Sequence, residues 1–341
     1  MGNKMLRTAR LEHSAVMLTD TPVVVSDQSL DQPHIERLTA IDLRPVFIVA
    51  PHRSGTTLLY RTLAESGSFN VVTVNHIVNR HRLLHLYFTG QYEMARAELN
   101  RYFQSKGVPR ESQNSREFNA DTLEEYCYAF DRQTHRPRLA PDNAEQFKLF
   151  CKKLQVIQDP SRRLLLKNPF DGTGFLYIPQ VFPEARFVFI YRNPVDVINS
   201  KIRQNRLLLG RKFEYHATFL QEYASLFAHP VKLAMARLIF SDKLPIMAEL
   251  VCRDVSSNFD YVLKNFAKLG ERAIGVTYPE LCNEPTRTVR RIMEFLGVEE
   301  RKPRDYAFMI RKREPEILPE VERRRSRILK RNEAYCREFQ V

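Results

Sequence analysis

Residues 46–59 read VFIVAPHRSGTTLL, and this stretch decides the fold. Val46 to Ala50 is a continuous apolar run, which is typical of a parallel strand buried on both faces. Pro51 to Gly55 then predict a loop, and a helical pattern runs from Thr56 to about Glu65. Such a loop directs backbone N–H groups and a helix N-terminus at the crevice beyond the strand ends. The stretch therefore predicts an anion site at the edge of an α/β sheet.

Three further apolar runs repeat this arrangement along the chain. Leu164 to Leu166 ends in Lys167-Asn168-Pro169, Arg186 to Tyr191 ends in Arg192-Asn193-Pro194, and Ala273 to Tyr278 follows as a last strand. Helical patterns separate the runs, and strands that alternate with helices form parallel sheets. The sequence predicts a three-layer α/β fold, in which helices flank a central parallel sheet.

The chain divides into three parts by composition. Residues 1–42 are polar and irregular and are expected to form an arm that wraps the surface. Residues 43–300 form the α/β domain, with helical insertions at about 79–160 and 203–270 that are expected to build the substrate walls. Residues 301–341 are basic and are expected to form a C-terminal tail.

Composition limits the class of protein. With 53 Lys and Arg against 40 Asp and Glu among 341 residues, the net charge of +13 suits a polyanionic ligand or surface. No run approaches the ~18–20 apolar residues of a transmembrane helix, and the N-terminus does not resemble a secretory signal. The cysteines form no C-x-x-C pair, which predicts reduced thiols, no zinc site and a cytoplasmic protein; they are Cys127, Cys151, Cys252, Cys282 and Cys336.

The loop at residues 50–57 has the layout of the phosphate loop in P-loop NTPase-like folds. In the nucleotide pattern G-x-x-x-x-G-K-[ST], however, the first glycine is replaced by Ala50 and the lysine by Thr56. That lysine contacts the β- and γ-phosphates of a nucleoside triphosphate, so its absence disfavours ATP or GTP hydrolysis. Backbone N–H groups, hydroxyls and a guanidinium can still bind a phosphate here.

Residues 53–59, Arg-Ser-Gly-Thr-Thr-Leu-Leu, resemble the 5′-phosphosulfate loop of the sulfotransferases that use 3′-phosphoadenosine 5′-phosphosulfate (PAPS). A second segment, residues 186–200, is similar to the 3′-phosphate site of the same family, with Arg192 after the strand and Ser200 eight residues later. Charge-assisted hydrogen bonds from a guanidinium suit a phosphate monoester. The resemblance implies that these positions bind the donor: Arg53, Ser54, Gly55, Thr56, Thr57, Arg192 and Ser200.

Two further residues match the family. Lys167 resembles the family's lysine at the end of the preceding strand, where an ammonium can stabilise charge during transfer. Tyr278 resembles the aromatic residue that packs on adenine. The chain departs from the family pattern at Ala50 and His52, which replace a usual glycine and proline, and it lacks a glycine-rich C-terminal phosphate segment.

The resemblance implies in-line transfer of a sulfonate from PAPS to a hydroxyl or amine, without a metal. Lys167 and Arg53 are the expected catalytic cations, and a base should deprotonate the acceptor. His76 is the first candidate for that base, because it follows an apolar run expected near the crevice and its ordinary pKa suits the role. The competitors are Glu124, Glu125 and His52, whereas Asp171 is expected to be a helix N-cap.

Two other functions compete with this interpretation. A P-loop kinase or phosphotransferase would share the fold, and Thr56 argues against it. A non-catalytic protein that binds an anionic polymer would explain the basic surplus, but no helix-turn-helix, zinc finger or aromatic RNA platform is visible, so no nucleic acid partner is expected. The sequence leaves a small-molecule, a lipid and a saccharide acceptor open, and it carries no signal of the oligomeric state.

Overall fold

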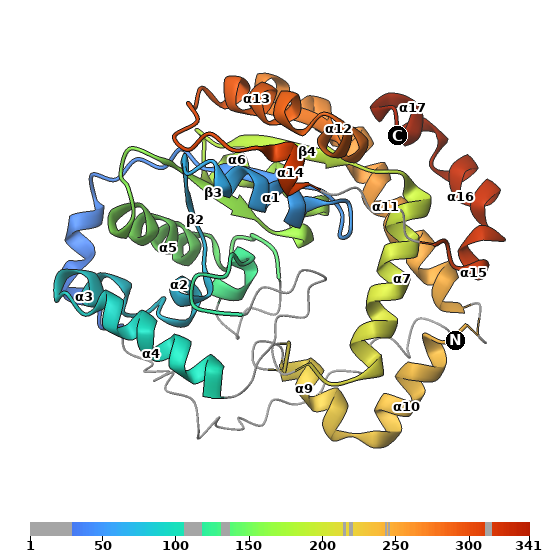
Figure 1. Cartoon of the computed structure of the whole chain (residues 1–341), viewed down its shortest axis with the longest axis horizontal. Helices are drawn as coiled ribbons and strands as arrows, with labels where there is room; N and C mark the ends of the chain where they lie inside the picture. Colours follow the sequence, from blue (N-terminus) through green and yellow to red (C-terminus); the bar gives the residue numbers. More distant parts are fainter. Residues whose placement is uncertain are drawn as a thin grey trace.

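The computed structural model describes residues 29–105, 118–130, 137–213, 216–217, 221–242, 244, 246–310 and 316–341. Its centre is a single sheet of five parallel strands in the order β2-β3-β1-β4-β5 (Figure 1). The strands are β1 (Val46–Val49), β2 (Phe69–Val71), β3 (Arg163–Lys167), β4 (Arg186–Tyr191) and β5 (Ala273–Thr277). The predicted three-layer α/β fold is confirmed.

Strand β1 lies between β3 and β4, and their register sets the positions of the predicted site residues at the strand ends. Ile48 pairs with Lys167 on one side, and Val49 pairs with Phe189 on the other. The strand order reverses direction around β1, and ligands of open α/β sheets bind at such a switch point, beyond the carboxyl ends of the strands. The loop after β1 therefore lies where an anion site is expected.

One face of the sheet is covered by α1 (Thr56–Glu65) and α13 (Pro285–Leu296). Val46 and Ile48 point to this face and pack with leucine and isoleucine side chains of the two helices. Helix α13 follows α12 (Tyr278–Asn283), and it ends at Gly297, whose φ of +62° allows the left-handed turn of a helix C-terminus. The left-handed glycine thus ends α13 at Leu296.

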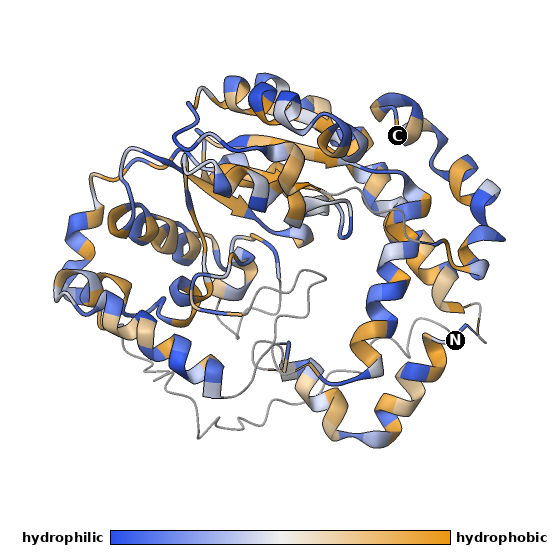
Figure 2. Cartoon of the chain, in the orientation of Figure 1, coloured by the Kyte–Doolittle hydropathy of each residue, from blue (hydrophilic) through white to orange (hydrophobic). Residues whose placement is uncertain are grey.

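The larger hydrophobic core lies on the other face of the sheet. Phe47 and Val49 of β1 belong to this core, and along the strand they alternate with Val46 and Ile48, which face the other way. Figure 2 shows the central strands as hydrophobic, as expected for strands buried on both faces. The helices on this side are α5 (Ala144–Ile157), α11 (Ile246–Asn265) and the start of α7 (Pro194–Gly210). Both faces of the sheet are therefore covered by helices. The predicted site residues Lys167 and Arg192 lie at the carboxyl ends of the strands.

The two insertions are built mostly from helices. Helix α2 (Val74–Val78) precedes the first insertion, which contains α3 (Leu83–Phe88), α4 (Tyr92–Ser105), the 3₁₀ helix η2 (Tyr126–Ala129) and α5. The segment after β3 forms η3 (Pro169–Thr173), η4 (Phe175–Tyr177) and α6 (Ile178–Val181). The second insertion contains α9 (Gln221–Ala228), α10 (Pro230–Ile239), α11 and η5 (Phe266–Arg272). Helix α7 runs away from the sheet toward α9 and α10 (Figure 1).

The described residues before β1 and those after α13 pack on this body. Within the segment expected as an arm, residues 1–28 lie outside the described residues, and η1 (Gln32–Leu38) packs near α5. The described residues of the segment expected as a basic tail, 301–310 and 316–341, contain four short helices, and Tyr335 and Phe339 are buried in the larger core. These helices are α14 (Tyr306–Met309), α15 (Pro319–Glu322), α16 (Arg325–Arg331) and α17 (Glu333–Phe339).

Three observations bear on the predicted class of protein. Within the described residues, no helix combines the length and apolar composition that crossing a bilayer requires. In the same part of the chain, no three His, Cys, Asp or Glu side chains come together as metal ligands would. The five cysteines are free thiols.

Candidate functional site

The loop between β1 and α1 has a special backbone conformation. Gly55, the residue before α1, has a φ of +106°, and Arg53 has a φ of +73°. A Cβ atom at Gly55 would lie 2.5 Å from a ring carbon of Tyr278, so only glycine fits there. The positive φ at Arg53 costs free energy for a residue with a side chain, and such strained positions cluster at binding sites.

Hydroxyl groups surround the first turn of α1. Ser54 is fully buried, and its Oγ has no hydrogen-bond partner among the described residues. Thr56 is also buried, whereas Thr57 is exposed. A buried hydroxyl without a partner costs free energy unless a ligand satisfies it. Next to the positive end of a helix, such hydroxyls fit an anion.

Arg53, Arg192 and Ser200 meet beside this loop, although they come from distant parts of the sequence. Nε of Arg53 donates to Oγ of Ser200 at 2.9 Å. Nη1 of Arg192 donates to the carbonyl oxygen of Arg53 at 3.3 Å. Desolvation and, second, the Arg192 cation lower the pKa of Arg53. The fold thus holds two guanidinium groups and a hydroxyl close together.

Local sequence explains where Arg192 and Ser200 lie. Asn193 caps α7, because its side chain accepts a hydrogen bond from the N–H of Val195, and Pro194 occupies the first helical turn. Arg192 is buried at the end of β4, and its Nε makes no hydrogen bond among the described residues. The nearest carboxylate oxygen that pairs with it, on Asp196, is 3.7 Å away. This guanidinium therefore retains hydrogen-bonding capacity for an anion.

Tyr278 joins the cluster as its aromatic member. Its ring lies against Gly55, and the guanidinium carbon of Arg192 lies 4.1 Å from the ring centroid. Tyr278 is the first residue of α12, directly after β5, and Thr277 caps that helix. The structure therefore brings Tyr278 to the same edge of the sheet as the phosphate loop.

Lys167 is the last residue of β3 and is almost completely buried. Its Nζ donates to Thr57 Oγ1 at 3.0 Å and forms an ion pair with Glu125 Oε1 at 2.6 Å. The Glu125 side chain is 18% exposed, so it is accessible at the surface of the site. The pair places an ammonium and a carboxylate directly beside the loop. No spacing or pattern in the sequence indicates that Lys167 and Glu125 touch.

His52 also faces this cluster. Burial lowers the pKa of His52 to about 4, and Glu125 raises it, while Lys201, Lys167 and Arg53 lower it. Its ring meets the ring of Phe170 edge-on, with centroids 4.6 Å apart. His52 is therefore neutral at pH 7 and is a weak base.

His76 has a different environment. It lies in α2, where its Nδ1 accepts the N–H of Thr73 at 3.1 Å as part of a capping box. Its Nε2 lies 2.8 Å from the hydroxyl oxygen of Tyr92, and burial lowers its pKa to about 4. Because Nδ1 accepts a hydrogen bond, Nε2 carries the proton of the neutral ring and donates to Tyr92. The ring has no free lone pair for a substrate proton, which favours a structural role.

The expectation that Asp171 caps a helix is wrong. Asn168 is the N-cap of η3, since its side chain accepts the N–H of Phe170. Asp171 lies inside η3, where its carboxylate accepts hydrogen bonds from the hydroxyl of Tyr126 and from the N–H of Leu139. Burial raises its pKa to about 6. The carboxylate ties η2 and the 137–141 segment to the end of β3.

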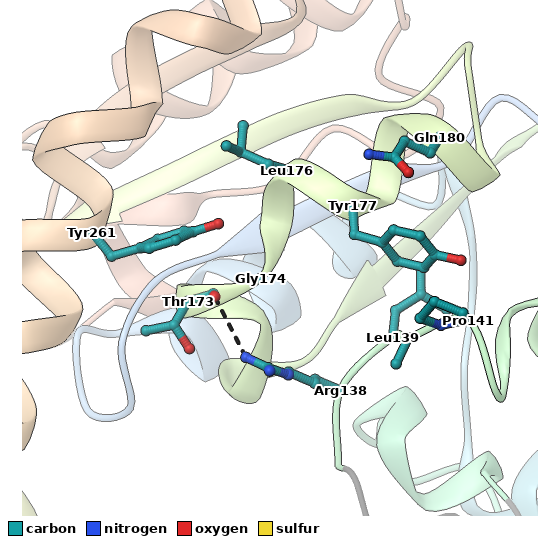
Figure 3. Close-up of a pocket in the computed structure, with 10 residues that line it drawn as sticks. Arg138, Leu139, Pro141, Thr173, Gly174, Leu176, Tyr177, Gln180 and Tyr261 are labelled. Atoms are coloured by element: carbon teal, nitrogen blue, oxygen red, sulfur yellow. Dashed lines mark hydrogen bonds between the residues drawn. The ribbon is translucent and has the colours of Figure 1, made fainter.

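A cavity of about 320 Å³ lies next to η3. Arg138, Tyr177 and Tyr261 approach it from three different segments, and Arg138 Nη1 donates to the carbonyl oxygen of Thr173 at 3.5 Å (Figure 3). None of the predicted site residues lines this cavity. The cluster around the phosphate loop is therefore separate from it.

Known proteins resemble this chain in sequence and in fold. The family model described as "Sulfotransferase family" matches residues 45–302. Among solved structures, sulfotransferase STF9 from Mycobacterium avium matches with a TM-score of 0.55 and 18% identity, over 88% of this chain and 71% of that chain. Sulfotransferase STF1 from Mycobacterium tuberculosis H37Rv matches with a TM-score of 0.51 and 17% identity, over 90% of this chain and 80% of that one.

A comparison with curated proteins gave no significant match. The two structural matches, at such low identity, show the fold alone. The family match covers the phosphate loop, the Lys167 strand, the Arg192 strand and Tyr278, that is, every element that contributes to the cluster. The chain belongs to the sulfotransferase family.

Proposed function

We propose that this protein transfers the sulfonate group of PAPS to a hydroxyl or amine of an acceptor by in-line displacement. The observation that carries the proposal is the convergence of Arg53, Arg192 and Ser200 beside the phosphate loop. A terminal phosphate monoester, which distinguishes PAPS from most nucleotides, needs several charge-assisted donors at one place. A kinase would need a lysine where Thr56 stands.

The donor would bind at two subsites, one for the 3′-phosphate and one for the 5′-phosphosulfate. Arg192 and Ser200 would hold the 3′-phosphate, and Tyr278 would pack against adenine. The residues of the loop, from Arg53 to Thr57, would hold the 5′-phosphosulfate through hydroxyls and backbone N–H groups. The buried hydroxyl of Ser54, which has no partner among the described residues, fits this group. Bound PAPS supplies an activated sulfonate, whose leaving group is the 5′-phosphate of the nucleotide.

Lys167 would stabilise the charge that develops on the transferred group and the leaving phosphate. Its Nζ already lies 3.0 Å from Thr57 Oγ1, so only a small shift brings it to a ligand in the loop. Preorganised charge of this kind is usually the largest contribution to catalysis. Arg53 would assist from the other side of the loop.

Glu125 is the carboxylate best placed to act as the general base. Its Oε1 is 2.6 Å from Lys167 Nζ, and its side chain is partly exposed, so an acceptor can approach it. Glu124 is buried, and one of its oxygens accepts the N–H of Glu125. The ring nitrogens of His76 are engaged elsewhere. We therefore place the base at Glu125, one of the competitors to His76 named above.

Calorimetric titration tests the donor. We expect 3′-phosphoadenosine 5′-phosphate (PAP) to bind with micromolar affinity without added metal, and 5′-AMP at least about tenfold more weakly, because it lacks the 3′-phosphate. Arg192→Ala should weaken PAP binding by about 10- to 100-fold and leave 5′-AMP binding nearly unchanged. Preference for ATP with Mg²⁺ over PAP would exclude the proposal in favour of a phosphotransferase.

Substitution of Glu125 tests the base. Glu125→Gln should lower kcat by about 10²- to 10⁴-fold, because the amide cannot accept the acceptor proton, while the Kd of PAP changes little. The assay is PAP release from PAPS with an acceptor found by screening alcohols, phenols, amines and saccharides. Glu124→Gln is the control, since it keeps an oxygen for the N–H of Glu125. Equal losses in both variants would argue against Glu125.

A further inference from the structure

The geometry points to a positioning role for the C-terminal segment, residues 316–341. We propose that this segment holds Ser200 and Arg192 in the arrangement that binds the 3′-phosphate, without contacting the phosphate itself. The inference rests on the proposed function, because it concerns the same subsite. It is carried by two separate sets of contacts, one to α7 and one to the end of β4.

The first set involves Asn199, the residue before Ser200. Asn199 is fully buried, and its side-chain amide pairs with the backbone of the segment. Its Nδ2 donates to the carbonyl oxygen of Glu316 at 3.1 Å, and its Oδ1 accepts the N–H of Leu318 at 3.0 Å. Two hydrogen bonds in opposite directions restrict both the position and the rotation of this turn of α7. Ser200 moves with that turn.

Two arginines on the following turns extend the same contact. Arg203 Nη1 donates to the Glu316 carbonyl oxygen at 2.6 Å. Arg206 Nη2 forms an ion pair at 2.6 Å with Glu320, whose side chain is 7% exposed. Positions 199, 203 and 206 lie on one face of a helix, because they are spaced by four and three residues. The segment therefore follows α7 over two turns.

The second set involves Tyr191, the residue before Arg192. Its ring stacks on Phe339, with centroids 3.9 Å apart and ring planes inclined by 20°. On the neighbouring strand β5, a Cβ atom at Gly275 would lie 2.5 Å from a ring carbon of Tyr191. The last residue of β4 is thus held between β5 and α17.

Tyr335 strengthens this contact. Its ring stacks on Phe259 of α11 with centroids 4.0 Å apart, and it meets the Tyr191 ring edge-on with centroids 6.2 Å apart. Both Tyr335 and Phe339 are buried in the larger core. The residues that precede the two predicted phosphate ligands, Tyr191 and Asn199, are therefore both fixed by one segment.

This arrangement has a physical consequence for donor binding. A guanidinium and a hydroxyl that are already in place lose little conformational entropy when the phosphate binds. Displacement of such groups by about 1 Å can cost up to 100-fold in function. Loosening the segment should therefore weaken binding of the 3′-phosphate specifically, while contacts to the rest of the nucleotide persist.

The test compares PAP with 5′-AMP by calorimetry, because their affinity ratio isolates the 3′-phosphate. Phe339→Ala and Asn199→Ala should each reduce this ratio at least about fivefold, with the Kd of 5′-AMP within about twofold of wild type. Phe339→Tyr should keep the ratio, because it preserves the stacked ring. Circular dichroism and thermal melting establish that each variant is folded.

Phe103→Ala is the matched control for loss of a buried aromatic ring. Phe103 packs in a separate cluster with Phe118 and Leu99, so this variant should lose stability and keep the ratio. Arg203→Met serves if the core variants do not fold, since Arg203 is exposed, and it should lower the ratio by at least about twofold.

The outcomes separate the two proposals. If wild-type protein binds PAP and 5′-AMP equally well, there is no 3′-phosphate subsite, and both the proposed function and the positioning role are overturned. If wild type discriminates but the folded variants keep the same ratio, the positioning role is overturned. A reduced ratio in the folded C-terminal variants, with an unchanged ratio in Phe103→Ala, supports the role.

Discussion

Among single residues, the two histidines near the first insertion show that burial decides what a side chain can do. His52 and His76 both have a pKa lowered to about 4, and burial is the main cause for each. Both are neutral at pH 7, yet only His52 faces the cations of the predicted site. The ordinary pKa of histidine, which made His76 attractive as a base, does not apply inside the protein.

The stability of the folded protein should depend on pH through His76. The unfolded chain, with an ordinary pKa of 6.5, binds a proton between pH 6.5 and 4 that the folded chain excludes. Stability is therefore greatest above pH 6.5 and falls as the pH approaches 4, by up to about 3 kcal/mol from this residue. Urea unfolding between pH 7 and 4.5 should show a steeper loss for wild type than for His76→Gln.

The same variant separates the structural role from the catalytic one. With Glu125 as the base, His76→Gln should retain kcat within about threefold once the protein is folded. A loss of kcat of about 100-fold or more, with unchanged PAP affinity, would restore His76 as the candidate base. An equal pH dependence of stability in both proteins would argue against the buried, neutral state.

Among the elements, the turn from β1 into α1 depends on one glycine. Gly55 has a φ of +106° and lies against the ring of Tyr278. One residue therefore allows the turn and contacts the side chain that we propose packs against adenine. Other element boundaries also depend on single residues: Asn193 caps α7, and Gly297 ends α13. The ends of these helices therefore depend on residues that are close together in the sequence.

Substitution of this glycine should damage donor binding. Gly55→Ala adds backbone strain of about 1–3 kcal/mol and forces the Tyr278 ring away from the loop. We expect PAP binding, measured by calorimetry, to weaken at least tenfold, on the order of 1.4 kcal/mol. Gly210→Ala is the control, because a Cβ there meets nothing within 4 Å. Unchanged PAP affinity in Gly55→Ala would contradict the role of this turn.

For the whole molecule, one buried ion pair attaches the segment before β1 to the domain. Asp31 Oδ2 lies 2.7 Å from Lys153 Nζ, and both side chains are almost fully buried. Asp31 also accepts the N–H of His85 at 2.9 Å, and Lys153 donates to the carbonyl oxygen of Arg80 at 2.9 Å. These contacts join η1, α3 and α5, so residues near position 31 belong to the folded body.

Breaking this pair should destabilise the protein strongly. Lys153→Met leaves a buried carboxylate without its counter-ion, and we expect a loss of about 3–5 kcal/mol in urea unfolding. The double variant Asp31→Asn/Lys153→Met should recover part of that loss, because no charge stays buried. Arg337→Met breaks an exposed pair with Glu333 and should cost under about 1 kcal/mol. A similar small cost for Lys153→Met would show that the pair is not buried.

The sequence by itself predicted the strands β1, β3, β4 and β5, the loop between β1 and α1, the Asn193 cap of α7 and the family motifs. The three-residue strand β2 is not among the strands that it predicts. The predicted features depend on residues close together in the chain, such as Asn193 and Val195. The sequence also predicted that Lys167 and Arg192 lie close together, because parallel strands bring their carboxyl ends to one edge of a sheet.

Only the tertiary structure decided which of these residues touch. Arg53 and Ser200 are 147 residues apart, and Lys167 and Glu125 are 42 apart, so no periodicity or spacing in the sequence reports their contact. The tertiary structure also places Tyr335 and Phe339 in the core, because these aromatic side chains of a basic segment pack against an apolar surface. Burial and long-range pairing depend on the whole fold, which local sequence patterns do not describe.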